Sequence, residues 1–334
     1  MSSVAHYVGL DYHQNSVQVC VMDQDARVKL NRRCNNDLAS LVPLLNSAGA
    51  VRKIALEACE GSADLAEALV QAGSWTVELA HPLYVSKIKG SPDKSDFSDA
   101  KLLADLSRVG YLPRVWLAPK PVRELRQLVE HRHRLASDRR ALKLRVGSVL
   151  RNERVKIEGT RWSKPWLAAV REQPGVSENG RWLIEQLLDE LESVQQRLLR
   201  AEARLRQVTA ADQTVAKLMT IEGIGEVTAW TLRAAIGRFD RFAKAKQLCR
   251  YCGLSPRNSA SGERQTQGEL INLVDRRLRA ILIQAAQRLV RLEPRWRALA
   301  ETLMKQGKPR NVAVAAVANR WMRTVHHRMT QMAG

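Results

Sequence analysis

The stretch His6-Tyr-Val-Gly-Leu-Asp11 decides the fold of this chain, because it is a short apolar run that ends in a carboxylate. Such a run is typical of a buried strand. Residues 16–22 are predicted as its hairpin partner, and a third strand is predicted near Val28. The chain therefore begins with three consecutive strands.

Helices and strands are predicted to alternate after these strands. Helical spacing covers residues 38–46, 62–72 and 96–109, while residues 53–57 and 75–79 have strand character, and the first of these strands also ends in a carboxylate, Glu57. Three hairpin-like strands followed by alternating helices and strands are typical of a ribonuclease-H-like α/β fold. We assign this domain to residues 1–115.

The second segment, residues 116–210, follows a proline-rich break. Two long stretches rich in Leu and Arg, residues 122–157 and 182–208, have helical spacing, and Pro and Gly residues separate them. They are predicted to form two antiparallel helices. A solvated bundle, a dimerising coiled coil and a basic nucleic-acid-binding pair all fit this pattern. Association is favoured, because a polar helix pair is expected to bury little on its own.

The third segment, residues 211–334, is predicted to be mainly helical. Gly223 and Gly225 separate two helical stretches, which predicts a helix-hairpin-helix element. A loop containing Gly and Ser is predicted over residues 253–268, a basic helix over 275–291 and a helix of small residues over 311–322.

Positive charge is concentrated in the last two segments. The 334 residues include 54 Lys or Arg and 34 Asp or Glu, a net charge of +20. Residues 1–115 hold 12 basic and 13 acidic side chains, residues 116–210 hold 20 and 12, and residues 211–334 hold 22 and 9. An excess of this size favours a polyanionic partner, nucleic acid first and an acidic membrane second.

Other features of the sequence narrow the class of protein. No apolar run is long enough to span a membrane, and the N-terminus lacks a signal-peptide pattern, so we expect a soluble intracellular protein. Aromatic residues make up 5%, and the Phe and Tyr among them are not interleaved with basic residues, which disfavours a base-stacking platform for single strands. The five cysteines are scattered, and Cys249 and Cys252 are expected to be small apolar residues on a helix face rather than metal ligands.

Four carboxylates are the candidate catalytic groups of the first segment: Asp11, Glu57, Asp96 and Asp99. Two end predicted strands, and two lie three residues apart on one helix, so a sheet with a helix packed on it could bring all four together. Clustered carboxylates suit Mg²⁺ or Mn²⁺, which promote phosphoryl transfer. The alternative is that Asp96 is a helix N-cap and Asp11 a turn residue.

Two elements of the third segment are candidates for contact with DNA. Glycines between helices let backbone N–H groups approach a phosphate, although Gly223 and Gly225 could also form a plain turn. Ser261 precedes a glycine and is flanked by Arg257 and Arg264, which could stabilise charge during attack on a phosphodiester. A Ser-Gly pair is more often only a turn.

Five motifs together resemble the DEDD transposases of insertion-sequence family one-ten, which are related to the Piv-type DNA invertases. They match in order and spacing, and the resemblance covers nearly the whole chain. The motifs are Gly9-Leu-Asp11, Leu56-Glu57-Ala58, Lys94-Ser-Asp96-Phe-Ser-Asp99-Ala100, Ile221-Glu-Gly-Ile-Gly225, and Tyr251-Cys-Gly-Leu-Ser-Pro-Arg257 leading to Ser261-Gly262.

The resemblance implies a two-part DNA recombinase of a bacterial mobile element. Its first domain would be RuvC-like, similar to a Holliday-junction resolvase, and would bind Mg²⁺ or Mn²⁺ through Asp11, Glu57, Asp96 and Asp99. Ser261 would become covalently joined to DNA, with Ser259 as the second candidate. A structured bridge RNA, DNA element ends and further copies of the chain, as dimers or tetramers, are the implied partners in the cytoplasm, near the nucleoid.

We expect nucleic-acid contacts in the third segment at Gly223, Gly225, Arg257, Arg264, Arg276, Arg277 and Arg279. One departure from the family pattern lies there: Glu-Leu-Ile-Asn-Leu-Val follows Gly268, where relatives are expected to have Ser, Lys and Gly. Two other functions fit the sequence, a metal-dependent hydrolytic junction nuclease and a non-catalytic nucleic-acid-binding assembly protein.

Overall fold

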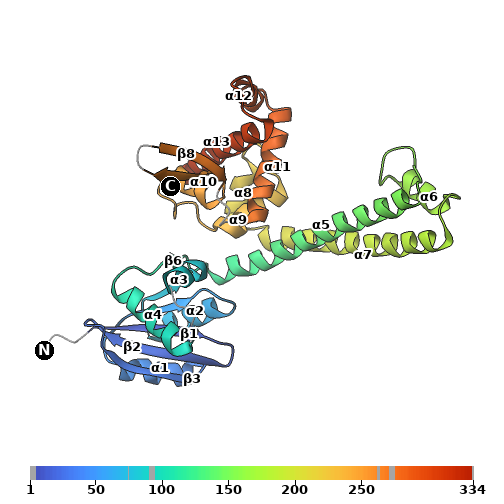
Figure 1. Cartoon of the computed structure of the whole chain (residues 1–334). Coiled ribbons are helices and arrows are strands. Elements are labelled where there is room, and N and C mark those ends of the chain that lie inside the picture. The colour runs from blue at the N-terminus through green and yellow to red at the C-terminus, as the bar shows by residue number, and fades with distance from the viewer. Residues whose placement is uncertain (1–4, 74, 90–94, 262–263, 271–274, 333–334) are drawn as a thin grey trace. The chain divides into compact units, whose positions relative to one another are not determined.

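The computed structural model describes residues 5–73, 75–89, 95–261, 264–270 and 275–332, with the backbone alone for 257–261 and 264–269. The chain divides into two compact units, residues 1–120 and 121–334 (Figure 1). Each unit is described by itself. The predicted boundaries at residues 115 and 210 stay predictions.

The first unit contains a mixed sheet and four helices in the residues that the structure describes. Its elements in chain order are β1 (His6–Tyr12), β2 (Ser16–Asp23), β3 (Val28–Asn35), α1 (Leu38–Ser47), β4 (Val51–Glu57), α2 (Ser62–Gly73), β5 (Val77–Ala80), α3 (Pro82–Lys89), α4 (Asp96–Arg108) and β6 (Arg114–Val115). Sequence analysis missed α3 and β6.

The sheet has the strand order β3-β2-β1-β4-β5-β6. Strands β1, β2 and β3 are antiparallel, whereas β4 runs parallel to β1 and β5 parallel to β4. The short strand β6 is antiparallel to β5. This arrangement fits the predicted ribonuclease-H-like fold.

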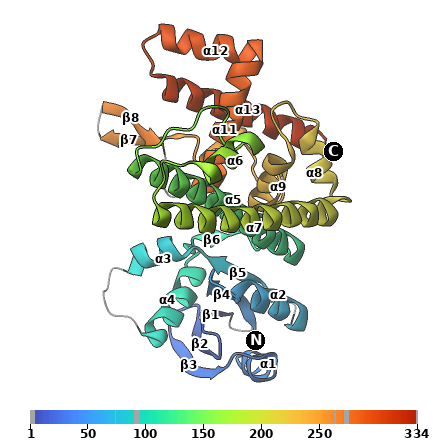
Figure 2. The same cartoon turned by 90° about the vertical axis from the view of Figure 1, so that its right-hand side faces the viewer.

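Helices cover both faces of the sheet, as Figure 2 shows for α2 and α4. On one face, the leucines of α1 and α2 pack against alternate valines and leucines of β1 and β2. On the other face, Ala100 and Ala104 of α4 pack against Cys20 and Met22 of β2. The site described below lies on this second face.

Small residues let α4 pack unusually close to the sheet. Gly9 of β1 is paired with Cys20 of β2 and with Ala55 of β4, so three small residues lie side by side across three strands. A Cβ atom on Gly9 would overlap the backbone carbonyl oxygen of Ala100 and lie 2.5 Å from the nitrogen of Ala104. Glycine at this position is therefore required for α4 to pack on β1.

The second unit consists of helices and one hairpin in the part of it that is described. Its elements are α5 (Lys120–Asn152), α6 (Lys164–Glu172), α7 (Glu178–Thr209), α8 (Gln213–Met219), α9 (Glu226–Ile236), α10 (Ala245–Tyr251), β7 (Pro256–Ser261), β8 (Arg264–Leu270), α11 (Arg276–Leu292), α12 (Pro294–Lys305) and α13 (Arg310–Gln331). Sequence analysis missed α6, α10 and α12, and α13 is longer than predicted.

The helices α5 and α7 form the predicted antiparallel pair. Arg132, in the first half of α5, forms an ion pair with Glu202, near the end of α7, at 2.8 Å. At the opposite end, the Ser177 hydroxyl donates a hydrogen bond to Glu153. The pair also has its own apolar core, which includes Leu135, Leu142, Val146, Ile184, Leu188 and Trp166 of α6. The expectation that this pair would bury little on its own was therefore wrong.

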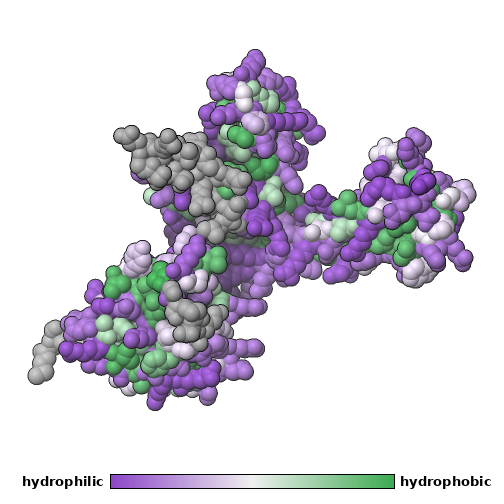
Figure 3. Space-filling view, in the orientation of Figure 1, coloured by the Kyte–Doolittle hydropathy of each residue, from purple (hydrophilic) through white to green (hydrophobic). Residues whose placement is uncertain are grey.

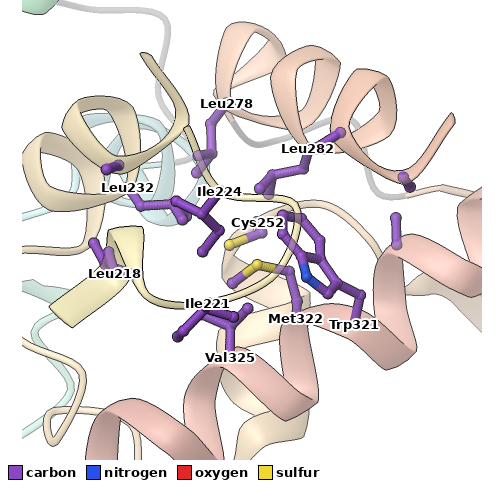
Figure 4. Packing of buried hydrophobic residues seen from close by; sticks show 14 of the residues in the cluster. Leu218, Ile221, Ile224, Leu232, Cys252, Leu278, Leu282, Trp321, Met322 and Val325 are labelled. Carbon is purple, nitrogen blue, oxygen red and sulfur yellow. The ribbon is translucent and has the colours of Figure 1, made fainter. Parts of the chain in front are cut away.

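The remaining helices of the second unit share one core. Leu218 of α8, Ile221 and Ile224 of the following turn, Leu278 of α11 and Trp321 of α13 contribute to it (Figure 4). Cys249 and Cys252 are buried there as free thiols, and burial raises the pKa of both, which disfavours the thiolate form that binds metal. The expectation that they are small apolar residues is confirmed.

The predicted loop over residues 253–268 is instead a β-hairpin. Strands β7 and β8 are antiparallel, and Ser261 is paired with Arg264. The polar composition of both strands hid this element from sequence analysis. Among the helices described, none has the length and apolar character to cross a membrane.

Candidate active site and nucleic-acid interface

The candidate active site begins at the ends of two parallel strands. Asp11 follows Gly9 by two residues in β1, and Glu57 follows Ala55 by two residues in β4. Because side chains alternate along a strand, both carboxylates lie on the face that α4 covers. Leu10 is paired with Leu56, so Asp11 and Glu57 are neighbours across the two strands.

The other two carboxylates come from the first turn of α4. Ser95 is the N-cap, and its side chain accepts a hydrogen bond from the nitrogen of Ser98, so Asp96 and Asp99 are within the helix. Asp96 lies one turn before Ala100, which contacts Gly9. The alternative in which Asp96 is an N-cap and Asp11 a turn residue is wrong, because Ser95 caps α4 and Asp11 is in β1.

Electrostatic contacts show that these carboxylates are close together. Burial raises the pKa of Asp11, and the negative charges of Asp96 and Asp99 add to the rise, while His13 opposes it. Ligand atoms of Asp11, His13 and Asp96 all lie within 4.8 Å of one another. The structure therefore brings three of the four predicted carboxylates together and places Glu57 beside Asp11.

Three basic side chains that sequence analysis missed contact this cluster. His13 Nε2 lies 3.3 Å from Asp11 Oδ2 and 3.3 Å from Asp96 Oδ1. Arg33 of β3 forms an ion pair with Asp96 at 3.1 Å, and Lys89 of α3 forms one with Asp99. His13 could have been noticed, because it lies two residues after Asp11 at a predicted strand end. The other two depend on tertiary contacts between distant parts of the chain.

The raised pKa of Asp11 predicts that Asp11→Asn stabilises the metal-free protein at neutral pH. In the unfolded chain Asp11 ionises near its ordinary pKa of 3.8, whereas in the folded chain its pKa is higher. Between the two values the folded state binds more protons, so stability falls as pH rises through this window. Asparagine cannot ionise and avoids this loss.

Thermal unfolding in EDTA between pH 3.5 and 7 measures this effect. The melting temperature of Asp11→Asn should exceed that of the wild type at pH 7, and the difference should shrink toward pH 3.5. Asp25→Asn, at an exposed position of the same unit, is the matched control. A lower melting temperature of Asp11→Asn across the whole range would contradict the prediction.

The glycine turn of the second unit lies between α8 and α9. Gly223 has a φ of +84° and lies against Leu289, so its lack of a side chain has a structural reason. Gly225 is the N-cap of α9, and a Cβ atom there would meet nothing within 4 Å. Ile221 and Ile224 anchor the turn in the core. The exposed N-terminus of α9 is a suitable place for an anion.

The predicted serine and arginine contacts lie in β7, β8 and α11. Ser259 and Ser261 are in β7, which begins just before Arg257, and Arg264 begins β8. Asp275 caps α11, which carries Arg276, Arg277 and Arg279 in its first turn. Arg277 forms an ion pair with Glu130 of α5. The positions of these residues within the second unit are thus described, and their roles stay predictions.

Two family models match this chain. The model described as a transposase of the IS116/IS110/IS902 family matches residues 215–301. A DEDD transposase model of the IS110 type matches residues 8–153. The two matched segments contain the four carboxylates, the glycine turn and Ser261.

Curated proteins with related sequences are also transposases by name. The chain is 28% identical to the "Probable family 20 transposase" of Pseudomonas aeruginosa over 94% of this chain and 93% of that protein. It is 25% identical to the transposase for insertion sequence element IS1328 of Yersinia enterocolitica, over 95% of this chain and 94% of that protein. It is also 25% identical to the transposase for insertion sequence element IS1111A of Coxiella burnetii, over 85% of this chain and 78% of that protein.

Proposed function

We infer that this chain is a transposase of the IS110 family, which cleaves and rejoins DNA, because models of this family match residues 8–153 and 215–301. We propose that Asp11, Glu57, Asp96 and Asp99 are its catalytic carboxylates and Ser261 its nucleophile. One observation supports the proposal for the carboxylates. Asp11 and Glu57 end neighbouring parallel strands, and the first turn of α4 brings Asp96 and Asp99 close to Asp11. Carboxylates arranged in this way are suited to phosphoryl transfer.

A divalent cation fits this cluster of donors. Ligand oxygens of Asp11 and Asp96 lie within 4.8 Å of each other. The pKa of Asp11 is raised first by burial and further by the negative charges of Asp96 and Asp99. Oxygen-rich sites of this kind bind Mg²⁺ or Mn²⁺, and His13 adds a nitrogen that Mn²⁺ accepts more readily. When bound, such an ion stabilises negative charge on the phosphoryl oxygens and the leaving oxygen.

The proposed reaction exchanges one phosphodiester for another. Ser261 Oγ attacks the phosphorus, a bond between serine and phosphate forms, and the bond to the 3′ oxygen breaks. The serine proton is transferred overall to the 3′ oxygen, which leaves as a hydroxyl. Rejoining is the reverse reaction with a different 3′ hydroxyl. Because the serine ester keeps the energy of the broken bond, no external energy source is required.

Arg257 and Arg264 are proposed to bind the phosphate during this exchange. They come before and after Ser261 in the hairpin, and Ser261 is paired directly with Arg264. Guanidinium groups bind phosphate oxygens in a bidentate manner and stabilise charge that develops in the transition state.

A structured bridge RNA and further copies of the chain are the proposed partners besides DNA. The large basic excess of residues 116–334 supports an RNA partner. Several large apolar side chains of the helix pair remain more than half exposed in the isolated chain, which supports association between copies. They are Leu144, Trp182 and Leu199.

The variant Ser261→Ala tests the proposed nucleophile. With labelled double-stranded DNA that carries the junction of the element's own ends, wild-type protein should form an adduct that survives denaturing electrophoresis. Ser261→Ala should form none, and strand exchange should fall by at least roughly 10³-fold, because the attacking oxygen is missing. Ser259→Ala, two residues away in the same strand, is the matched control and should keep both activities.

Retention of DNA cleavage by Ser261→Ala, with no adduct in the wild type, would contradict the serine mechanism and favour a hydrolytic nuclease. Loss of the adduct in Ser259→Ala alone would assign the nucleophile to Ser259.

A further inference from the structure

A large cleft in the second unit is not explained by the proposed chemistry. One wall is formed by α5 and the segment after it, and the other by the glycine turn and α11. Its volume is about 1430 Å³, larger than a typical small-ligand site. Figure 3 shows mostly hydrophilic side chains around the concave surface between α5 and α11. The cleft is suited to a large polar partner.

The charge of the cleft is strongly positive. Among the described residues, those that line it include nine Lys or Arg and two Glu. One of these acids, Glu226, already forms an ion pair with Arg206 at 2.8 Å. Exposed cations of the α5 wall have no ion pair with a carboxylate in the part of the chain that the structure describes. They are Arg140, Arg151 and Arg161.

Positively charged side chains of this wall also repel one another. Lys143 lines the cleft, and both burial and the positive charge of Arg139 lower the pKa of Lys143. Repulsion between neighbouring cations destabilises the wall unless an anion compensates it. The arrangement therefore favours a partner with several negative charges.

Contacts from the N-terminal half of α5 hold the two walls of the cleft together. Arg126 donates a hydrogen bond of 2.7 Å to the carbonyl oxygen of Ala234 in α9, and His133 lies 3.2 Å from the Thr231 hydroxyl. The ion pair between Arg277 of α11 and Glu130 of α5 joins the walls directly. Because these contacts order the cleft before a partner arrives, less conformational entropy is lost on binding.

Base stacking is not the means of recognition here. The half-buried Trp162 lines the cleft, but its ring already contacts Trp166 at 4.8 Å and the Lys143 ammonium at 4.8 Å. Gly225 exposes the N-terminus of α9 on the opposite wall, with open space around its α carbon. Both walls therefore present groups that bind phosphate rather than bases.

We propose that this cleft binds a nucleic-acid double helix, the α5 wall contacting one phosphate backbone and the glycine turn with α11 contacting the other. The inference rests on the proposed function, since it names the place where a duplex partner of the recombinase binds. Both duplex RNA and duplex DNA carry the two phosphate backbones that these contacts require.

The triple variant Arg140→Gln, Arg151→Gln, Arg161→Gln of the full chain tests this proposal. Its affinity for a labelled 20-base-pair RNA duplex, a DNA duplex and a single strand of equal length is measured over a range of salt concentrations. For at least one duplex, affinity near 0.1 M salt should fall about a hundredfold. The slope of log K against log salt should become shallower by about 2 to 3. If the RNA duplex loses affinity the partner is RNA, and if the DNA duplex loses affinity the partner is DNA.

The matched control carries Arg145→Gln, Arg197→Gln and Arg200→Gln, which remove three exposed arginines of the same helix pair outside the cleft. It loses the same charge and should bind at least tenfold more tightly than the cleft variant. A third variant, Arg140→Lys, Arg151→Lys, Arg161→Lys, keeps the positive charges and should keep wild-type affinity, which excludes misfolding as the cause of the loss.

Equal losses in the cleft and control variants would overturn the proposal, as would a loss confined to the single strand. Adduct formation through Ser261 is scored separately with the DNA junction. Failure of the serine mechanism therefore leaves the result for duplex binding intact.

Discussion

Replacing Asp96 and Asp99 together by Asn is expected to lower DNA cleavage by at least roughly 10³-fold, because loss of several kcal/mol of charge stabilisation has an effect of this size. Both side chains keep their shape, and Ser95 still caps α4, so the fold should persist. DNA affinity should stay equal or rise, because two negative charges that repel phosphate are removed. Cleavage and binding are measured separately, with the junction DNA and by fluorescence anisotropy.

Asp105→Asn is the matched control for this variant. Asp105 is on the same helix and forms an ion pair with Arg108 at 2.6 Å, away from the other carboxylates. Its cleavage rate should stay within about twofold of the wild type, since a surface ion pair contributes little. Unchanged cleavage in the double variant would remove the carboxylates from the mechanism. Absence of cleavage by wild-type protein that still binds DNA would favour a non-catalytic assembly protein.

Gly9→Ala is expected to destabilise the first unit by about 3 kcal/mol or more, because overpacking against fixed backbone is costly. The added methyl group would overlap the carbonyl oxygen of Ala100 and approach the nitrogen of Ala104 at 2.5 Å. Neither atom belongs to a side chain that could rotate away. Even where the variant folds, α4 must shift, so cleavage should fall as well. Urea unfolding of the full chain measures the change.

Gly225→Ala serves as the control for this prediction. Its added methyl group would meet nothing within 4 Å, and the N-cap position should lose roughly 1 kcal/mol or less. Wild-type stability in Gly9→Ala would mean that α4 does not contact β1 through its backbone.

Much of the first unit could be predicted from local patterns. The apolar strands that end in Asp11 and Glu57 and the amphipathic helix from Asp96 are each visible within about ten residues of sequence. Since carboxyl ends of neighbouring parallel strands lie at one edge of a sheet, the proximity of Asp11 and Glu57 follows from topology alone.

The contacts around these carboxylates could not be predicted in the same way. Arg33 and Lys89 reach Asp96 and Asp99 from other elements, and α3, which carries Lys89, has several exposed apolar residues that blur its helical pattern. The close packing of α4 depends on Gly9, Cys20 and Ala55, which are far apart in the chain.

The second unit illustrates two different errors. The hairpin of β7 and β8 has no apolar alternation, so its strands are defined by backbone pairing, which leaves no signal in the sequence. The core of the helix pair, by contrast, was visible. Leu135 and Leu142 are seven residues apart, a spacing that places both on one face of a helix.

The backbone contact between β1 and α4 also limits how this protein can vary. An α-helix rises 1.5 Å and turns 100° with each residue, so deletion of one residue between Ser95 and Ala100 would rotate Asp96 away from Asp11 while the alanines stayed in place. A one-residue deletion or insertion within this first turn is therefore expected to abolish DNA cleavage. The five-residue interval from Ser95 to Ala100 therefore fixes where the proposed catalytic carboxylates of α4 lie relative to Asp11.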